Sequence, residues 1–150
     1  MKRNYKKLLP GIFTVLCSLA FMTGRAQDTK FYLYKGMVDG NMPVTLFLKA
    51  EYNGCTADAF YQGMYQYDKK SNWLQVYPTQ NSKSQFALVE YGFSGVLILQ
   101  QNGKNFNGTW ISPDAKRQLK VELKEVALPK AEKEKLEKKL EEVNYENHDC

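Results

Sequence analysis

The chain is poor in histidine and cysteine, the residues on which many catalytic and metal sites depend. Among its 150 residues it has 1 histidine, His148, close to the C terminus. A His-dependent catalytic triad or a histidine-rich metal site therefore has no components here, and we expect no metal or other cofactor. The 3 cysteines are Cys17, Cys55 and Cys150. A chain of this length buries a core without a disulfide framework.

No apolar run in the chain is long enough to form a transmembrane helix. The longest extends over residues 8–22, about 15 residues, whereas a membrane-spanning helix needs about 20. Basic residues precede this run and Gly24-Arg25-Ala26 follows it, a pattern typical of a secretory signal peptide. We expect cleavage after Ala26 and a secreted or periplasmic protein. Cys17 is not expected to carry a lipid, because Leu16 precedes it and the apolar run continues beyond it.

Net charge is also lacking once the predicted signal peptide is removed. The full sequence has 21 Lys and Arg residues against 16 Asp and Glu residues. Five of the basic residues and none of the acidic ones precede Gln27, so 16 of each sign remain in the mature chain. Nucleic acids and anionic membranes are bound largely by accumulated Lys and Arg. We therefore expect no nucleic-acid partner.

Between residues 31 and 126 the chain is divided into short runs rich in aromatic and β-branched residues. Turn residues such as Asn53-Gly54 and Asn102-Gly103 separate the runs, and this spacing is typical of an all-β domain. The connections are too short for crossover helices, so neighbouring strands should pair antiparallel. The predicted strands are 31–38, 43–50, 59–67, 72–78, 84–91, 94–101, 105–112 and 117–126.

After Pro129 the composition changes to Glu, Lys and Leu, which predicts a helix over 130–143. Leu136, Leu140 and Val143 form a narrow apolar stripe on it. We expect this stripe to dock the helix on strands 86–89 and 96–99, which are apolar on both faces and must be covered twice. A coiled coil or partner helix is the alternative, although only two heptads are available.

These elements predict three regions: a signal peptide over 1–26, a β-domain over 27–128, and a charged helix and tail over 129–150. For the β-domain we expect an eight-stranded up-and-down β-barrel, because closure removes the exposed strand edges of a flat meander. An open or sandwiched sheet is the alternative. A barrel of this strand number is filled by side chains or holds one small ligand.

Sixteen aromatic residues lie between 28 and 128, a dense set for about a hundred residues. A tyrosine-rich lining suits a flat apolar or sugar-like ligand, because each ring supplies contact area and each hydroxyl a directed hydrogen bond. The alternative is that these are ordinary strand residues on a pleated surface. The candidate ligand-binding residues are Tyr61, Tyr65, Tyr67, Trp73, Tyr91 and Trp110.

Catalysis has little support in the sequence. A carboxylate pair for glycoside hydrolysis would have to come from Glu51, Asp58 or Glu90, and Glu90 is the one flanked by apolar residues. A lone glutamate at a strand end is more often simply solvated, and no positioned partners are evident. We therefore expect a protein that is not an enzyme.

Cys55 and Cys150 would remain in the exported chain and either form a disulfide or stay as free or intermolecular thiols.

Glycine and aromatic residues recur in six short pieces of the predicted strands. The pieces are Lys35-Gly36-x-Val38, Val44-x-Leu46-x-Leu48, Gly63-x-Tyr65-x-Tyr67, Leu88-x-Glu90, Gly95-x-Leu97 and Asn107-Gly108-Thr109-Trp110. Over residues 31–126 this pattern resembles small uncharacterised exported proteins of Bacteroidota, which implies an envelope or secreted location and no particular activity. The Gly-Thr-Trp piece is also faintly similar to strand openings in avidin-type and lipocalin-type barrels.

Two hypotheses for function follow from this. The first is a secreted or periplasmic binding module for a small apolar or glycan-like ligand or for an envelope protein. The second is a structural or inhibitor-like interaction domain with a filled barrel, which would use the 86–99 region or the helix stripe as its contact surface.

Overall fold

The structure, a computed structural model, describes residues 28–52 and 58–148. Within them the chain forms eight strands followed by a helix, in the order expected from the sequence. The elements are β1 (Asp28–Val38), β2 (Met42–Tyr52), β3 (Ala59–Tyr67), β4 (Leu74–Gln80), β5 (Gln85–Glu90), the short 3-10 helix η1 (Tyr91–Phe93), β6 (Val96–Asn102), β7 (Asn105–Ile111), β8 (Gln118–Val126) and α2 (Lys130–His148).

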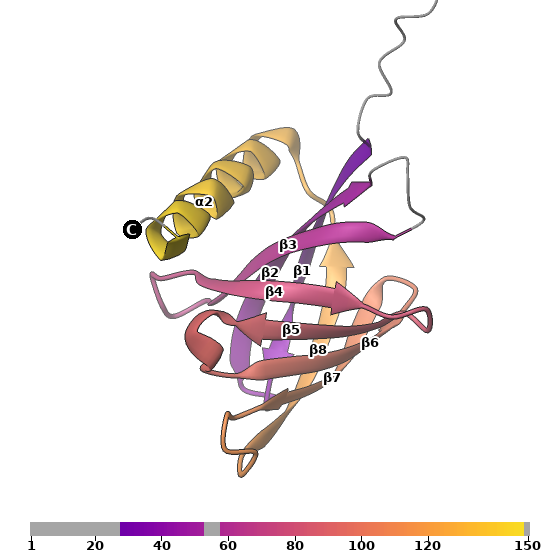
Figure 1. The fold of residues 1–150 in the computed structure, drawn as a ribbon, viewed down its shortest axis with the longest axis vertical. Helices are drawn as coiled ribbons and strands as arrows, with labels where there is room; N and C mark the ends of the chain where they lie inside the picture. Colours follow the sequence, from indigo (N-terminus) through magenta and orange to yellow (C-terminus); the bar gives the residue numbers. More distant parts are fainter. Residues whose placement is uncertain (1–27, 53–57, 149–150) are drawn as a thin grey trace, which may run out of the picture.

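The strands form a closed antiparallel barrel (Figure 1). Each strand pairs with its neighbour in the sequence, and β1 also pairs with β8, from Leu33 opposite Val126 to Val38 opposite Val121. The predicted up-and-down barrel is therefore confirmed, and the open or sandwiched sheet is wrong. Gly36 lies at this closing seam, where a Cβ atom would collide with the backbone of Glu122 and Leu123.

Strict alternation decides which side chains fill the barrel. On β3, for example, Tyr61, Gly63, Tyr65 and Tyr67 share the inner face, as their period of two predicts. The fully or nearly buried interior residues are Tyr34, Val38, Val44, Leu46, Leu48, Tyr65, Val76, Phe86, Leu88, Leu97, Leu99, Phe106, Val121 and Leu123.

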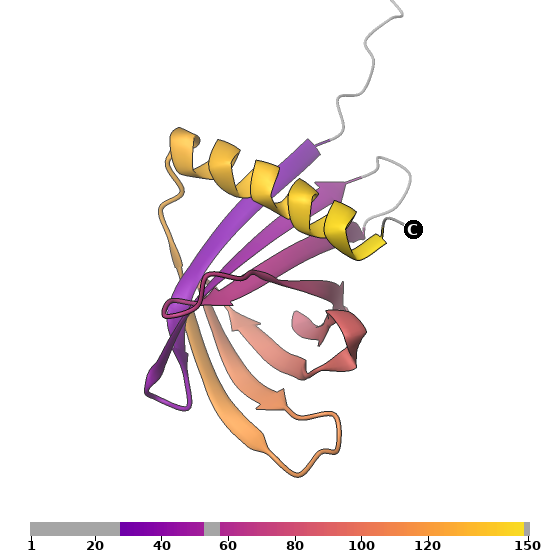
Figure 2. The ribbon, with the colours of Figure 1, turned by 90° about the vertical axis from the view of Figure 1, so that its left-hand side faces the viewer.

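Helix α2 packs outside the barrel, across β1, β2 and β3 (Figures 1 and 2). Its predicted stripe is confirmed: Leu136, Leu140 and Val143 are buried. They meet the outward side chains Leu33, Phe47 and Met64. The expected docking site on strands 86–89 and 96–99 is therefore wrong, because β1 and β2 also carry apolar side chains on both faces.

The outer face of β5 and β6 consequently stays uncovered by the described residues. Ala87 is paired with Ile98, and Val89 with Val96, in the middle of this face. Ile98 is 46% exposed, and Ile111 of β7 continues the apolar surface beside Val96. We call these residues the outer apolar face.

Candidate functional site

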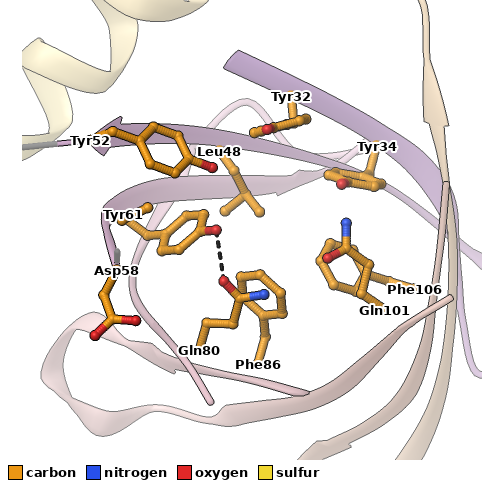
Figure 3. A pocket seen from close by; sticks show the side chains of 11 residues that line it. Tyr32, Tyr34, Leu48, Tyr52, Asp58, Tyr61, Gln80, Phe86, Gln101 and Phe106 are labelled. Atoms are coloured by element: carbon orange, nitrogen blue, oxygen red, sulfur yellow. Dashed lines mark hydrogen bonds between the residues drawn. The ribbon is translucent and has the colours of Figure 1, made fainter. Parts of the chain in front are cut away.

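The two ends of the barrel differ in how they are filled. We call the end where β1 begins and β2 ends the mouth, and the opposite end, where β1 ends and β2 begins, the base. A cavity of about 260 Å³ opens at the mouth (Figure 3). Its lining consists of Tyr32, Tyr34, Leu48, Tyr52, Asp58, Ala59, Tyr61, Gln80, Phe86, Gln101 and Phe106. We call it the mouth cavity.

Aromatic rings form the body of the mouth cavity. Alternation on β1 turns both Tyr32 and Tyr34 inward, since they are two residues apart. Their rings stack with centroids 6.5 Å apart, and the Tyr34 centroid lies 4.6 Å from that of Phe106. Phe86 meets Phe106 edge-on at 5.0 Å and Tyr61 edge-on at 5.2 Å. The rings therefore form one continuous packed surface.

Polar groups are set among these rings at defined positions. The Tyr61 hydroxyl donates a hydrogen bond of 2.8 Å to Gln80 Oε1, at the end of β4 (Figure 3). The Tyr34 hydroxyl is hydrogen-bonded to the side chain of Gln101 on β6. Tyr52, the last residue of β2, interacts with both Tyr32 and Tyr61. Hydroxyl and amide groups thus alternate with ring faces around the cavity.

Tyr32, Tyr34 and Tyr61 stay protonated well above neutral pH. Burial, followed by the neighbouring Tyr52 hydroxyl, raises the pKa of Tyr32 to about 12 and that of Tyr61 to about 12. Burial and the charge of Glu125 raise the pKa of Tyr34 further. At neutral pH the phenolic oxygens are therefore neutral hydrogen-bond donors and acceptors.

Charged groups lie at the rim of the mouth cavity. Asp58 is exposed directly before β3. Lys30 Nζ lies 4.9 Å from the centroid of the Tyr52 ring and 3.5 Å from Asp28 Oδ2. The interior lining is otherwise made of aromatic, aliphatic and amide side chains, a chemistry that suits a small uncharged ligand with hydroxyl groups.

At the base, a buried carboxylate closes the barrel. Glu90 is 4% exposed. Its Oε1 accepts hydrogen bonds from the Tyr65 hydroxyl at 2.5 Å and from Trp110 Nε1 at 2.6 Å, and its Oε2 accepts one from Ser94 Oγ at 2.6 Å. A Cβ atom on Gly95 would collide with both Trp110 and Glu90. The expectation of a solvated glutamate is therefore wrong, and we call this group the Glu90 cluster.

The three candidate carboxylates for glycoside hydrolysis do not come together. Glu51 pairs with Lys49 at 2.9 Å. Asp58 lies at the mouth, seven residues along the chain from Tyr65, which is roughly 23 Å of extended strand. Glycosidases need two carboxyl groups about 5–9.5 Å apart. Both oxygens of Glu90 are instead held by hydroxyl and indole donors.

The six predicted ligand-binding residues fall into separate environments. Tyr61 alone lines the mouth cavity, while Tyr65 and Trp110 belong to the Glu90 cluster at the base. Tyr67 is half-buried, its ring centroid 5.6 Å from that of Tyr65. The other two lie outside the barrel. Trp73 packs with the residues beneath α2, and Tyr91 is 46% exposed on η1 beside His148.

Most residues of the mouth cavity were not predicted as a site from the sequence. Tyr32 and Tyr34 carried a usable signal, because they share the inner face with Tyr61 once the strand pairing is known. Gln80 and Gln101 carried none, since glutamine is common near strand ends. Which end of a barrel stays open depends on side chains from all strands.

Several expectations concern residues outside the described ranges. The signal peptide, Cys17, and the pair Cys55 and Cys150 belong to this group. Within 28–52 and 58–148, no helix combines the length and the hydropathy needed to cross a membrane. The same ranges contain no group of three or more His, Cys, Asp or Glu side chains placed to hold a metal ion.

The fold and the two ends define the molecule as an up-and-down β-barrel with a tyrosine-lined mouth and a closed base. Comparison with protein-family models, curated proteins and solved structures finds no match to the chain. Its chemistry must therefore be argued from its own residues.

Proposed function

We propose that this chain is an exported, non-enzymatic binding protein whose mouth cavity takes a single small ring bearing hydroxyl groups, such as a monosaccharide unit. The observation that carries this proposal is the lining itself. The hydroxyls of Tyr32, Tyr34, Tyr52 and Tyr61 alternate with aromatic faces around one opening. Rings supply stacking area and neutral hydroxyls pair with hydroxyls of the ligand.

The size of the mouth cavity limits the ligand. Its volume of about 260 Å³ lies below the roughly 300–1,000 Å³ typical of pockets for drug-sized molecules. A cavity of this volume is large enough for a single sugar ring and too small for a long acyl chain. The polar groups favour the glycan-like ligand over the purely apolar one, because each hydroxyl and amide can make more hydrogen bonds than the one it makes to its neighbour, and only a polar ligand would use this capacity.

The test is titration of the purified protein with a panel of neutral monosaccharides, in which calorimetry and ligand-observed NMR measure binding. For the sugar that binds, Tyr61→Phe should weaken affinity about three- to tenfold, because it keeps the ring and removes one hydroxyl worth about 1 kcal/mol. Tyr91→Phe is the matched control, since it removes a hydroxyl outside the barrel. A panel without any binding sugar, or equal losses in both variants, would contradict the proposal.

A protein-interaction domain is the second candidate, and the outer apolar face supports it. The helix stripe is buried against the barrel, so of the two contact surfaces expected from the sequence only the 86–99 region stays accessible. Ile98→Lys adds charge to this face without touching the mouth cavity. It should leave sugar binding intact and abolish any protein contact made here.

A further inference from the structure

A second pocket, of about 400 Å³, lies at the base of the barrel, at the end opposite the mouth cavity. Three turns surround it: the β1–β2 turn, the β3–β4 loop and the β7–β8 turn. Its lining consists of Asn41, Met42, Pro43, Tyr67, Lys69, Lys70, Trp110, Arg117 and Leu119. We call it the base pocket.

The floor of the base pocket is apolar and partly accessible. Met42, Tyr67, Trp110 and Leu119 are each half-buried and pack on the barrel core. The indole of Trp110 is held in place because its Nε1 donates to the buried Glu90. These side chains therefore present a preformed apolar surface rather than one that a ligand would have to assemble.

Three cationic side chains border this floor. Arg117 Cζ lies 5.8 Å from the centroid of the Trp110 ring, and Lys69 and Lys70 belong to the β3–β4 loop. None of the ion pairs found in 28–52 and 58–148 includes any of these three residues. The lining contains no acidic residue, so the base pocket carries three positive charges in a chain whose predicted mature form is neutral.

Hydrogen bonds fix the turns that carry these cations. The backbone N–H of Arg117 donates to Ser112 Oγ at 3.0 Å, and the carbonyl of Arg117 accepts from the backbone N–H of Ser112 at 3.0 Å. In the β3–β4 loop, Lys70 N–H donates to the Tyr67 carbonyl at 2.8 Å, and Gln66 Nε2 donates to the Lys70 carbonyl at 2.7 Å. The backbone positions of the cations are thus set before a ligand arrives.

Three acidic groups near the base pocket are engaged elsewhere. Asp68 accepts a hydrogen bond from Thr45 Oγ1 at 3.1 Å. Asp114 accepts one from Ser112 Oγ at 2.6 Å and lies 3.8 Å from Lys116 Nζ. Glu90 is buried and accepts three hydrogen bonds. None of the three carboxylates lines the pocket.

We propose that the base pocket binds a small amphipathic carboxylate, with its apolar body on Trp110 and Tyr67 and its anionic group beside Arg117. An apolar floor alone would suit a neutral molecule and a cationic patch alone an inorganic anion, so the combination selects a ligand with both parts. A guanidinium presents a planar pair of donors that matches a carboxylate. The site is independent of the mouth cavity, because the two lie at opposite ends and differ in charge.

Octanoate and octan-1-ol are the matched probes, since they share an apolar chain and differ in the charge of the head group. We expect octanoate to bind the purified protein in calorimetry and octan-1-ol to bind at least tenfold more weakly. Raising the salt concentration should weaken octanoate binding, because screening acts on exposed charges. Equal affinity for both probes, or no octanoate binding, would overturn the proposal.

Two variants locate the bound octanoate. Arg117→Gln should weaken its affinity about tenfold, the factor that 1.4 kcal/mol gives. Lys104→Gln is the charge-matched control, because Lys104 lies in the β6–β7 turn at the mouth. Circular dichroism checks that both variants fold. Equal losses of affinity in the two variants would overturn the proposal. Unchanged octanoate binding in Tyr61→Phe would support it, because it would show that octanoate does not bind in the mouth cavity.

Discussion

A carboxylate inside an apolar barrel is stable only where its oxygens accept enough hydrogen bonds. Glu90 satisfies this condition with three donors from three different segments: Tyr65 on β3, Ser94 after η1 and Trp110 on β7. Burial is the larger cause and the hydrogen bond to Glu90 the second cause that raise the pKa of Tyr65. At this residue a polar group joins strands that are distant in the sequence.

Glu90→Gln should therefore destabilise the protein. The amide has one acceptor oxygen in place of two and turns an NH2 group toward donors, so we expect the free energy of unfolding to fall by about 2 kcal/mol or more. Urea denaturation measures this change. Glu122→Gln is the control, because Glu122 is exposed and its pair with Lys120 should contribute less than about 1 kcal/mol. Equal small effects in both variants would show that the Glu90 cluster is not stabilising.

At the scale of elements, α2 is attached by two kinds of contact. Its apolar stripe packs on the outer wall, and its C-terminal turns bond to β4 through amides: Gln75 Nε2 donates to Asn144 Oδ1 at 2.6 Å, and Asn147 Nδ2 donates to Gln75 Oε1 at 2.8 Å. These amides account for the helix extending to His148, beyond the predicted end at 143.

Leu140→Ala should cost about 2–5 kcal/mol of unfolding free energy, the usual range for a buried leucine. Leu140 is 1% exposed. Ile98→Ala on the outer apolar face is the control and should cost less, because Ile98 is largely exposed. Chemical denaturation compares the two variants. The reverse order of effects would mean that the helix covers β5 and β6.

The strands could be predicted from the sequence, and the partner of the helix could not. Residues 59–67 were predicted with the observed bounds, because a face of tyrosines and glycine alternates there with Gln62, Met64 and Gln66. The stripe on α2 showed which helix face is buried, but apolar residues on both strand faces occur in β2 as well as in β5 and β6. Only the packed structure shows which of these strands the helix covers. The mouth cavity could not be predicted from the sequence either, because its lining is assembled from side chains of β1 through β7.

At the scale of the whole molecule, the buried tyrosines couple stability to alkaline pH. The pKa of Tyr32 and of Tyr61 is about 12 in the folded protein, whereas the pKa of unfolded tyrosine is near 10. Above pH 10 the unfolded chain binds fewer protons, so unfolding becomes easier. Their contribution should be complete below about pH 9 and disappear as the pH rises from about 10 to 12.

Urea midpoints measured from pH 8 to pH 11 test this dependence. The midpoint should be nearly constant at first and fall above pH 10. A variant with both Tyr32→Phe and Tyr61→Phe should fall less steeply, because it has two fewer groups to ionise on unfolding. An identical pH dependence in the variant would assign the loss to other groups.

The closing seam between β1 and β8 has a consequence for how the chain reaches its fold. All other strand pairs join segments that follow one another, and each can form as a local hairpin. The seam joins Leu33 to Val126, so it has a larger loop-closure entropy cost than any of the hairpins. Gly36 keeps the two backbones close enough to meet there. The barrel can therefore be regarded as a ribbon of hairpins that becomes a ring through one long-range contact.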